Sequence, residues 1–311
     1  MEINKWELTR DDDLFPQRLK DEPSVTIDTL YGLGSPEILS SPSVAIIGAR
    51  RATPYGIAVA EMAGRIAGEC GITVVSGGAM GCDFAASRAA LEAGGTSIIV
   101  AGTGADRIYP SSSEMVFRKA VAQGGAIVSI EPWGTPPAPY VFPKRNVIIS
   151  GLCTTLFVAE AGERSGTMST ADAAVEMGRT IYAVPGSIFS PGCQGTNRLI
   201  LEGALPICSE VDLEQRLSMD FGVLRVIAEG ASVQVGEIVS ALVASPLRPD
   251  ELAARMGQTT LTILRTLADY ESRGIVEHLP DGTYSLTSGA YQEYRVGGPL
   301  LGGGDTHKDG E

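Results

Sequence analysis

The chain has 311 residues, 44% of them hydrophobic and 20% charged, which is the balance of an ordinary globular protein with one large and one small domain. No run of about 18 apolar residues is present, which argues against a membrane span, and the first residues lack the basic and apolar regions of a secretory signal. Five scattered cysteines without a Cys-x-x-Cys pair argue against a disulfide framework, so we expect a reduced, cytoplasmic protein.

The net charge of −13 lies mainly towards the two ends of the chain. Residues 1–40 carry a charge of −5, residues 41–210 carry −1, and residues 211–311 carry −7. This acidity disfavours general binding to nucleic acid, because neutralisation of phosphates drives such binding. The nearly neutral central region still permits a local cationic groove.

Residues 1–40 are expected to form an extension that packs on the core domain. From residue 41 to about residue 215, apolar runs that end in glycine or polar turns alternate with stretches typical of helices. The expected strands are Val44–Ile47, Thr73–Val75, Ser97–Val100, Ala126–Val128, Thr155–Val158 and Ile181–Val184, and the expected helices are Tyr55–Cys70, Cys82–Glu92, Ser112–Gln123 and Ala171–Gly178. Strands that are apolar throughout and alternate with helices indicate a Rossmann-like α/β domain with a doubly wound, mostly parallel sheet. Ligands of such sheets bind beyond the carboxyl ends of the strands.

Residues 220–290 have the pattern of a small winged helix-turn-helix domain, in which a hairpin around Pro280-Asp281-Gly282 follows short amphipathic helices. The expected helices are Val223–Ala228, Val235–Val243, Pro249–Met256 and Thr259–Arg273. In the last of these, arginines are balanced by acidic residues within an acidic segment, so a contact with protein is favoured over reading of a DNA groove. Residues 291–311 are expected to be a disordered tail.

Two turns at the ends of predicted strands have the composition of phosphate-binding loops. Glycine allows close approach of the backbone, hydroxyls cap helices or contact oxygens, and arginine grips phosphate with its planar fork. The candidate residues are Gly48, Arg50, Arg51, Thr53, Ser76 and Gly77. Neither turn is a Gly-x-Gly-x-x-Gly or Walker A motif, and a plain strand-to-helix turn with solvated arginines is the alternative interpretation.

Residues 140–146 combine aromatic, cationic and amide groups, and we expect a loop there. A stacking surface beside a guanidinium is what single-stranded nucleic acid requires. The candidates are Phe142, Lys144, Arg145 and Asn146. The alternative is an exposed loop that Phe142 only anchors.

A third candidate region precedes the helix Ala171–Gly178. Ser165, Gly166 and Thr167 place hydroxyls around a glycine at a helix amino terminus, which is the composition of an anion nest. Glu160 is a candidate acceptor for a ribose or a base. Ordinary helix capping is the alternative.

Catalytic chemistry has little support in this sequence. The two histidines, His278 and His307, lie in the expected wing and tail, so no histidine-based triad can form at the sheet edge. No spacing of His, Cys, Asp or Glu suggests a metal site.

The order and spacing of the motifs together resemble those of the DNA-processing protein A family (DprA, also called Smf). The resemblance runs from about Phe15 to Ile207 and continues into the winged helix. The matching stretches are Ile46–Gly56, Val75–Gly77, Ile108–Pro110, Phe142–Asn146, Glu160–Ala161, Arg164–Thr167 and Ala183–Gly186. The resemblance implies a cytoplasmic protein that is not an enzyme and needs no cofactor. It also implies that the protein binds single-stranded DNA, protects incoming DNA, forms a homodimer and loads the RecA recombinase in natural transformation.

Two of the departures from the family pattern remove a cation. Met80 and Val147 stand where the family carries cations. Each lost phosphate contact predicts weaker binding and a salt dependence that is shallower by about one unit of slope.

Two other functions remain open at this point. One is a nucleotide-sensing domain that signals through the winged helix. The missing cations suit such a domain better than they suit binding of a polymer. The other is a nucleotide phosphoribohydrolase of the LOG type, but Thr170 stands where the catalytic glutamate of that group should be.

Overall fold

The computed structural model describes residues 4–223, 225 and 237–296. The chain divides into two compact units, Met1–Ile227 and Ala228–Glu311, each with its own buried apolar residues. None of the helices in the described ranges combines the length and the apolar character needed to cross a bilayer.

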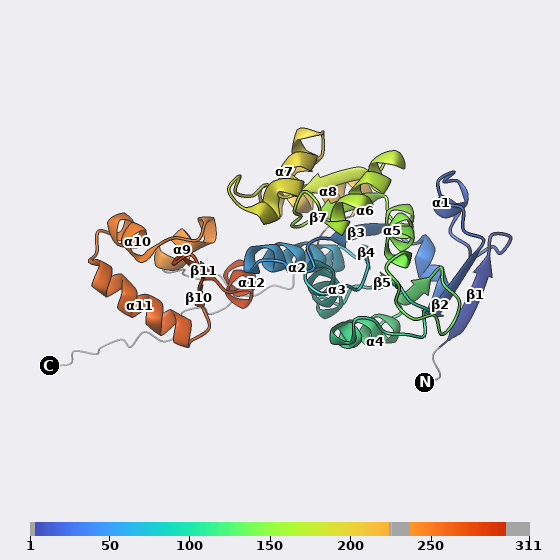
Figure 1. Ribbon diagram of the computed structural model, residues 1–311, viewed down its shortest axis with the longest axis horizontal. Helices are drawn as coiled ribbons and strands as arrows, with labels where there is room; N and C mark the ends of the chain where they lie inside the picture. The colour runs from blue at the N-terminus through green and yellow to red at the C-terminus, as the bar shows by residue number, and fades with distance from the viewer. Residues whose placement is uncertain (1–3, 224, 226–236, 297–311) are drawn as a thin grey trace. The chain divides into compact units, whose positions relative to one another are not determined.

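The first unit is built on a nine-stranded sheet with the order β1-β2-β6-β5-β4-β3-β7-β8-β9 (Figure 1). Seven of these strands run parallel: β3 (Ser43–Ile47), β4 (Thr73–Ser76), β5 (Ser97–Val100), β6 (Ala126–Ser129), β7 (Thr155–Val158), β8 (Thr180–Ala183) and β9 (Leu205–Pro206). The chain moves outwards from β3 to β6 and then places β7 on the other side of β3. The strand order therefore reverses between β3 and β7, where ligands of open α/β sheets bind. The predicted mostly parallel α/β sheet is confirmed.

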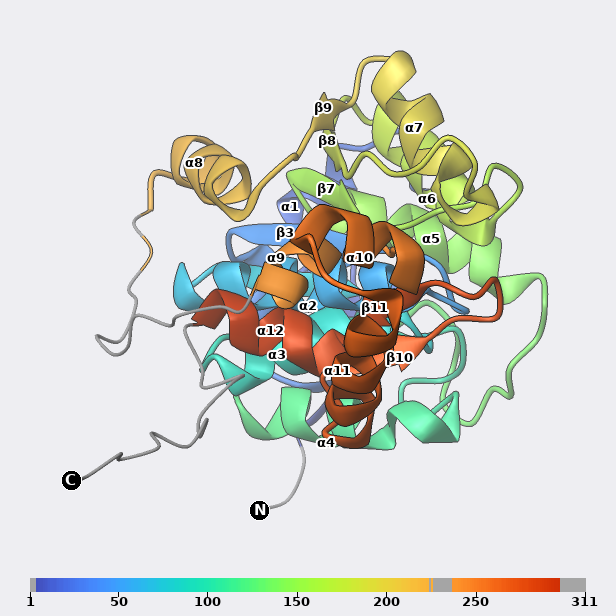
Figure 2. The same ribbon diagram turned by 90° about the vertical axis from the view of Figure 1, so that its left-hand side faces the viewer.

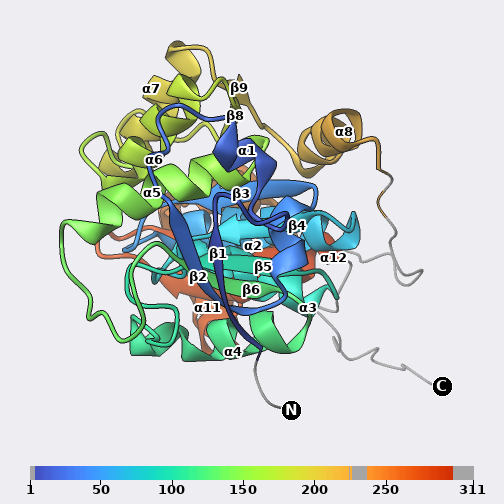
Figure 3. The same ribbon diagram turned by 90° about the vertical axis from the view of Figure 1, so that its right-hand side faces the viewer.

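Strand β3 shows why both faces of the sheet are covered. Val44 and Ile46 belong to the apolar cluster of one face, and Ala45 and Ile47 belong to that of the other, because successive side chains of a strand alternate. The helices on the first face are α2 (Pro54–Glu69), α3 (Cys82–Glu92), α4 (Glu114–Ala122) and α8 (Glu210–Phe221), and those on the second are α5 (Val141–Leu152), α6 (Gly166–Glu176) and α7 (Gln194–Leu201). Figures 1 and 3 show these layers on either side of the strands. Short 3₁₀ turns lie at Pro36–Ser40, Ser111–Ser113 and Pro191–Cys193.

The first 40 residues extend the sheet. Strand β1 (Lys5–Thr9) pairs antiparallel with β2 (Thr29–Gly34), and β2 pairs antiparallel with β6. Figure 3 shows this pair at the edge of the sheet. The short helix α1 (Gln17–Lys20) buries Leu19 against α5, where Arg18 donates a hydrogen bond of 2.6 Å to the carbonyl of Leu152.

One predicted loop is a helix. Residues 141–146, expected as part of a loop, form the first half of α5. Pro143 is the third residue of this helix, where its missing N–H breaks no hydrogen bond of the helix, so proline is tolerated there. Pro143 therefore does not prevent a helix here, and the loop prediction, which placed Arg145 on a loop, is wrong.

The second unit contains a helical group followed by a hairpin and a last helix (Figure 2). Its elements are α9 (Glu237–Ala244), α10 (Pro249–Met256), α11 (Thr260–Ser272), β10 (Val276–His278), β11 (Tyr284–Leu286) and α12 (Ser288–Val296). Leu247, between α9 and α10, forms a bridge with Tyr284 of the hairpin. Helix α12 extends into the segment predicted to be disordered, and residues 297–311 of that segment lie outside the described residues. The expected helix Val223–Ala228 falls almost wholly outside them as well.

Helices α2 and α3 pack closely because α2 carries glycines at their contact. A Cβ on Gly64 would lie 2.1 Å from the carbonyl oxygen of Ala86, and one on Gly68 would lie 2.7 Å from that of Ala90. These neighbours are backbone atoms, which cannot move away by a change of side-chain rotamer.

We therefore expect Gly64→Ala to lower the free energy of unfolding by about 1–3 kcal/mol, despite the better helix propensity of alanine. Urea unfolding followed by circular dichroism measures this. Gly166→Ala, in the same unit with open space around the added carbon, is the matched control and should change stability little. Equal stability of the two variants would contradict the close packing.

Candidate nucleic-acid interface

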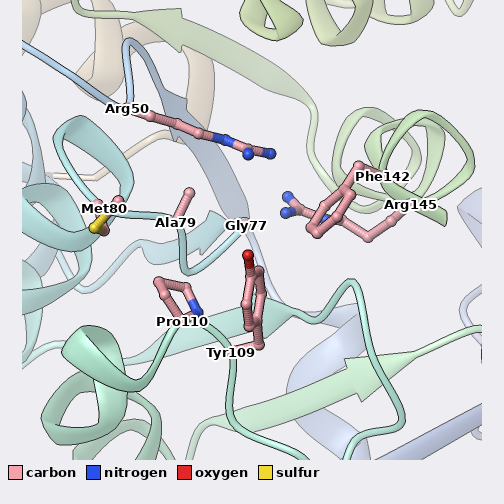
Figure 4. Close-up of a pocket in the computed structure, with 8 residues that line it drawn as sticks. All are labelled: Arg50, Gly77, Ala79, Met80, Tyr109, Pro110, Phe142 and Arg145. Atoms are coloured by element: carbon pink, nitrogen blue, oxygen red, sulfur yellow. The ribbon is translucent and has the colours of Figure 1, made fainter. Parts of the chain in front are cut away.

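A shallow pocket of about 40 Å³ lies at the carboxyl edge of the sheet. Loops after β3, β4 and β5 and the first turns of α5 contribute to it (Figure 4). Its lining residues are Arg50, Gly77, Ala79, Met80, Tyr109, Pro110, Phe142 and Arg145. Four of these, Arg50, Gly77, Phe142 and Arg145, are residues that the sequence predicted.

Arg145 is buried at this pocket, with 4% of its surface exposed. Gly77 leaves room for it, since a Cβ on Gly77 would lie 1.7 Å from Nη1 of Arg145 and 2.7 Å from Oδ2 of Asp83. Asp83 accepts a hydrogen bond of 3.0 Å from the Gly77 N–H. Burial lowers the pKa of Arg145 to about 10 and attraction by Asp83 opposes this fall, so the side chain stays charged at neutral pH. Its Nε has no hydrogen-bond partner within the described residues, which is rare for a buried donor.

Two guanidinium groups lie close to the Phe142 ring. The Cζ of Arg50 is 5.0 Å from the centre of its ring and that of Arg145 is 5.8 Å away, both within the range of cation–π attraction. Tyr109 also lies nearby, with 6.1 Å between the centres of the two rings. Figure 4 shows the Arg50 and Arg145 side chains pointing towards each other beside this ring. Because Arg50 is exposed and Arg145 is buried, the site pairs a movable cation with a fixed one.

The other cationic and amide candidates lie outside the pocket lining. Arg51 and Lys144 are exposed, and the Nζ of Lys144 lies 5.5 Å from the centre of the Tyr140 ring. Asn146 donates a hydrogen bond of 2.9 Å to Oγ of Ser169, so it connects α5 to the start of α6. Of these side chains, Arg51 and Lys144 are exposed and could contact a phosphate outside the pocket.

Ser76 and Gly48 are buried beneath the strand ends. Ser76 is fully buried, and its Oγ has no hydrogen-bond partner within the described residues. A Cβ on Gly48 would lie 2.5 Å from Sγ of Cys82, so this glycine is needed for packing against α3. The structure places both residues behind the surface that a ligand would touch.

Glu160 and Thr53 join the segment that follows β7 to the loop that follows β3 through hydrogen bonds. The Oγ1 of Thr53 donates a hydrogen bond of 2.6 Å to Glu160, the N–H of Thr53 lies 3.1 Å from the same carboxylate oxygen, and Thr53 also caps α2. Glu160 has 2% of its surface exposed, so its carboxylate holds this turn from inside. Burial raises the pKa of Glu160, and the hydrogen bonds from Thr53 oppose this rise.

The hydroxyls before α6 are divided between surface and interior. Thr167 is buried, Gly166 is exposed, and Oγ of Ser165 has no hydrogen-bond partner within the described residues. Ser165 is the cap residue of α6, but its side chain makes no capping hydrogen bond and its Oγ is buried, so an anion at this helix start would meet backbone N–H groups rather than the hydroxyl.

Four pocket residues were absent from the predicted site: Ala79, Met80, Tyr109 and Pro110. Tyr109 had a detectable signal, because an aromatic residue followed the third predicted strand within a stretch that matched the family. Its side chain is 44% exposed, as a stacking surface must be.

The comparisons with known proteins agree with this geometry. The family model of DNA recombination-mediator protein A matches residues 6–218. The chain belongs to the DprA family. It is 34% identical to protein Smf of Escherichia coli K12, over 83% of this chain and 71% of that protein. It is 37% identical to the DNA processing protein DprA of Streptococcus pneumoniae R6, over 65% of this chain and 71% of that protein.

Two solved structures of DprA proteins share the fold. That of the Streptococcus pneumoniae protein has a TM-score of 0.63 and 35% identity, covering 68% of this chain and 73% of that chain. The structure of the Helicobacter pylori protein, which concerns how that protein binds single-stranded DNA, has a TM-score of 0.60 and 30% identity. The match covers 70% of this chain and 98% of that chain. Membership of this family makes the chain a DNA-processing protein.

The two positions at which the resemblance implies a lost cation differ in their surroundings. Met80 is 49% exposed and lines the pocket. Val147 is partly buried and packs against the apolar cluster beneath α5. A cation at position 80 would therefore add charge to the pocket, whereas position 147 is not part of its lining.

The raised pKa of Glu160 gives a prediction for stability. The folded protein binds the proton of the Glu160 carboxyl more tightly than the unfolded chain does. The contribution of Glu160 to the free energy of unfolding therefore falls as the pH rises from 4.5 through the raised pKa. We expect Glu160→Gln to lose less stability than the wild type over this window. Urea unfolding at a series of pH values measures the difference.

Glu163→Gln is the matched control, because Glu163 is half exposed and paired with Arg198. Its pH dependence should follow that of the wild type. If Glu160→Gln also follows the wild type, the carboxylate is not the buried titrating group described above.

Proposed function

We propose that the pocket binds single-stranded DNA, with Arg50 and Arg145 contacting phosphates and Phe142 and Tyr109 stacking on bases. The observation that carries this proposal is the Phe142 ring with two guanidinium groups close to it at the carboxyl edge of the sheet. Aromatic faces beside cations bind unpaired bases of any sequence. The single-stranded DNA binding described for the Helicobacter pylori relative supports the same ligand.

The cellular role that we propose is protection of incoming DNA and loading of RecA in natural transformation, by a cytoplasmic homodimer. Support comes from the description of the matching family as a recombination mediator. This role requires binding without turnover, so we propose that the protein is not an enzyme.

The size of the pocket favours a polymer over an enclosed ligand. Sites that enclose a small molecule have volumes of several hundred Å³, and this one has about 40 Å³. A mononucleotide sensor is therefore the weaker proposal. The phosphoribohydrolase is weaker still, because the glutamate it requires is replaced by Thr170, which is itself buried.

For the second unit we propose a winged-helix fold that contacts protein. Three helices followed by a hairpin support the fold. On α11, Leu261 and Leu264 are 60% and 40% exposed, and Arg273 pairs with Asp269 at 3.3 Å. An apolar surface with a neutralised arginine suits a protein partner better than a phosphate backbone.

Arg50→Ala should weaken binding of oligo-dT about tenfold, the effect of one charge-assisted hydrogen bond. The salt dependence of binding should also become shallower by about one unit of slope. Fluorescence anisotropy of a labelled oligonucleotide, repeated at several salt concentrations, measures both. Arg50 suits this test better than Arg145, whose removal would leave a cavity and an uncompensated Asp83.

The control is Arg118→Ala, which removes an exposed arginine of α4 paired with Glu114. It should leave the affinity unchanged. Wild-type affinity in Arg50→Ala, with an unchanged melting temperature, would remove Arg50 from the binding site.

Met80→Arg tests the same pocket in the opposite direction. A cation at this half-exposed position should strengthen binding of oligo-dT several-fold and steepen its salt dependence by about one unit of slope. The same anisotropy titration measures this. Unchanged binding would mean that DNA does not pass over residue 80.

A further inference from the structure

Phe189 is the most exposed of the large hydrophobic side chains in the described ranges, with 89% of its surface accessible. Its neighbour Ile188 is 75% exposed. Both lie on the loop that follows β8, at the same edge of the sheet as the pocket. An exposed phenylalanine forfeits the stabilisation that burial would give, so its position calls for a partner.

The loop that carries Phe189 is held firmly at its base. Gly186 and Asn197 exchange two hydrogen bonds, of 3.1 and 3.0 Å, and Tyr55 donates one of 3.2 Å to the carbonyl of Pro185. The N–H of Phe189 donates to Oγ of Ser187 at 3.2 Å. The exposed ring therefore projects from a braced turn.

Glu160 connects this turn to the loop that carries the pocket arginine. One oxygen of its carboxylate accepts from Thr53, three residues after Arg50 in the chain. The other lies 2.7 Å from where a Cβ on Gly192 would be. The loop after β3 and the loop after β8 thus pack on opposite sides of one buried carboxylate.

Cations lie on the loops beside the Phe189 turn. Arg51 follows β3, and Arg164 follows β7 on a loop where a Cβ on Gly162 would lie 3.3 Å from the carbonyl oxygen of Pro191. Both arginines are exposed, and within the described residues neither forms an ion pair. Their charge complements a phosphate backbone.

We propose that Phe189, flanked by Ile188, is a second stacking site for bases of a single strand that leaves the pocket and crosses the ends of β3, β7 and β8. This inference rests on the proposed binding of single-stranded DNA and extends its path. Three strand spacings separate β4 from β8, or about 14 Å. About four nucleotides at the rise of a duplex strand cover that distance, so a longer oligonucleotide reaches both sites.

The test compares two long oligonucleotides, oligo-dT and one of equal length in which every base is replaced by an abasic residue. Phe189→Ala should weaken binding of oligo-dT about tenfold and leave the affinity for the abasic strand unchanged, because only stacking is lost. Arg50→Ala should weaken both, because it contacts phosphates. Met219→Ala, a similarly exposed apolar side chain on α8, is the matched control and should change neither.

A second variant reports the contact directly. In Phe189→Trp, oligo-dT should quench tryptophan fluorescence beyond the change seen in the wild type, which contains two tryptophans. No additional quenching, or an equal effect of Phe189→Ala on both strands, would overturn the stacking site.

The outcomes separate the two proposals. If the wild type does not bind oligo-dT, the proposed function fails and the second site fails with it. If Arg50→Ala weakens binding but Phe189→Ala does not, only the second site fails. If Phe189→Ala instead changes the sedimentation of the free protein without changing its affinity for oligo-dT, the ring belongs to a contact between copies of the chain and the second site is wrong.

Discussion

The buried carboxylate of Glu160 is the interaction on which the ligand-facing edge depends. It accepts hydrogen bonds from Thr53 after β3, while Glu160 itself follows β7 and its second oxygen faces Gly192 after β8. Gly56 is needed beside it, because a Cβ there would lie 1.8 Å from the carboxylate. Burying a carboxylate raises its pKa and lowers stability, but here it fixes loops from three strands against one another.

The same principle positions the buried cation. Arg145 occupies the space that Gly77 leaves open, and Asp83 holds the Gly77 backbone while opposing the effect of burial on the arginine. Arg50 has no such support, and stays exposed. The pocket therefore presents one preorganised charge and one adaptable charge beside Phe142, an arrangement that suits a flexible strand because less ordering is left for the moment of binding.

This local arrangement is compatible with the proposed binding of an anionic polymer by an acidic chain. The net charge of −13 acts over long distances and is screened by salt. Contacts between a phosphate and the pocket arginines would be short and partly shielded from water. The acidic residues gather towards the ends of the chain, and the described arginines near Glu69 and Glu210 form ion pairs away from the pocket. The exposed arginines at the strand ends are the ones left for phosphates.

The sequence alone determined the parallel sheet, the family and the candidate strand-end residues, because apolar runs, glycine turns and motif order are local signals. It did not determine α5, since Pro143 and adjacent charges resemble a loop until the first turn of a helix is seen to tolerate them. Nor did it separate buried from exposed members of the predicted site: Arg145, Glu160 and Ser76 turned inwards, while Tyr109 joined the pocket from a different loop. Those outcomes depend on which strand ends lie side by side, and only the order of strands in the folded sheet decides that.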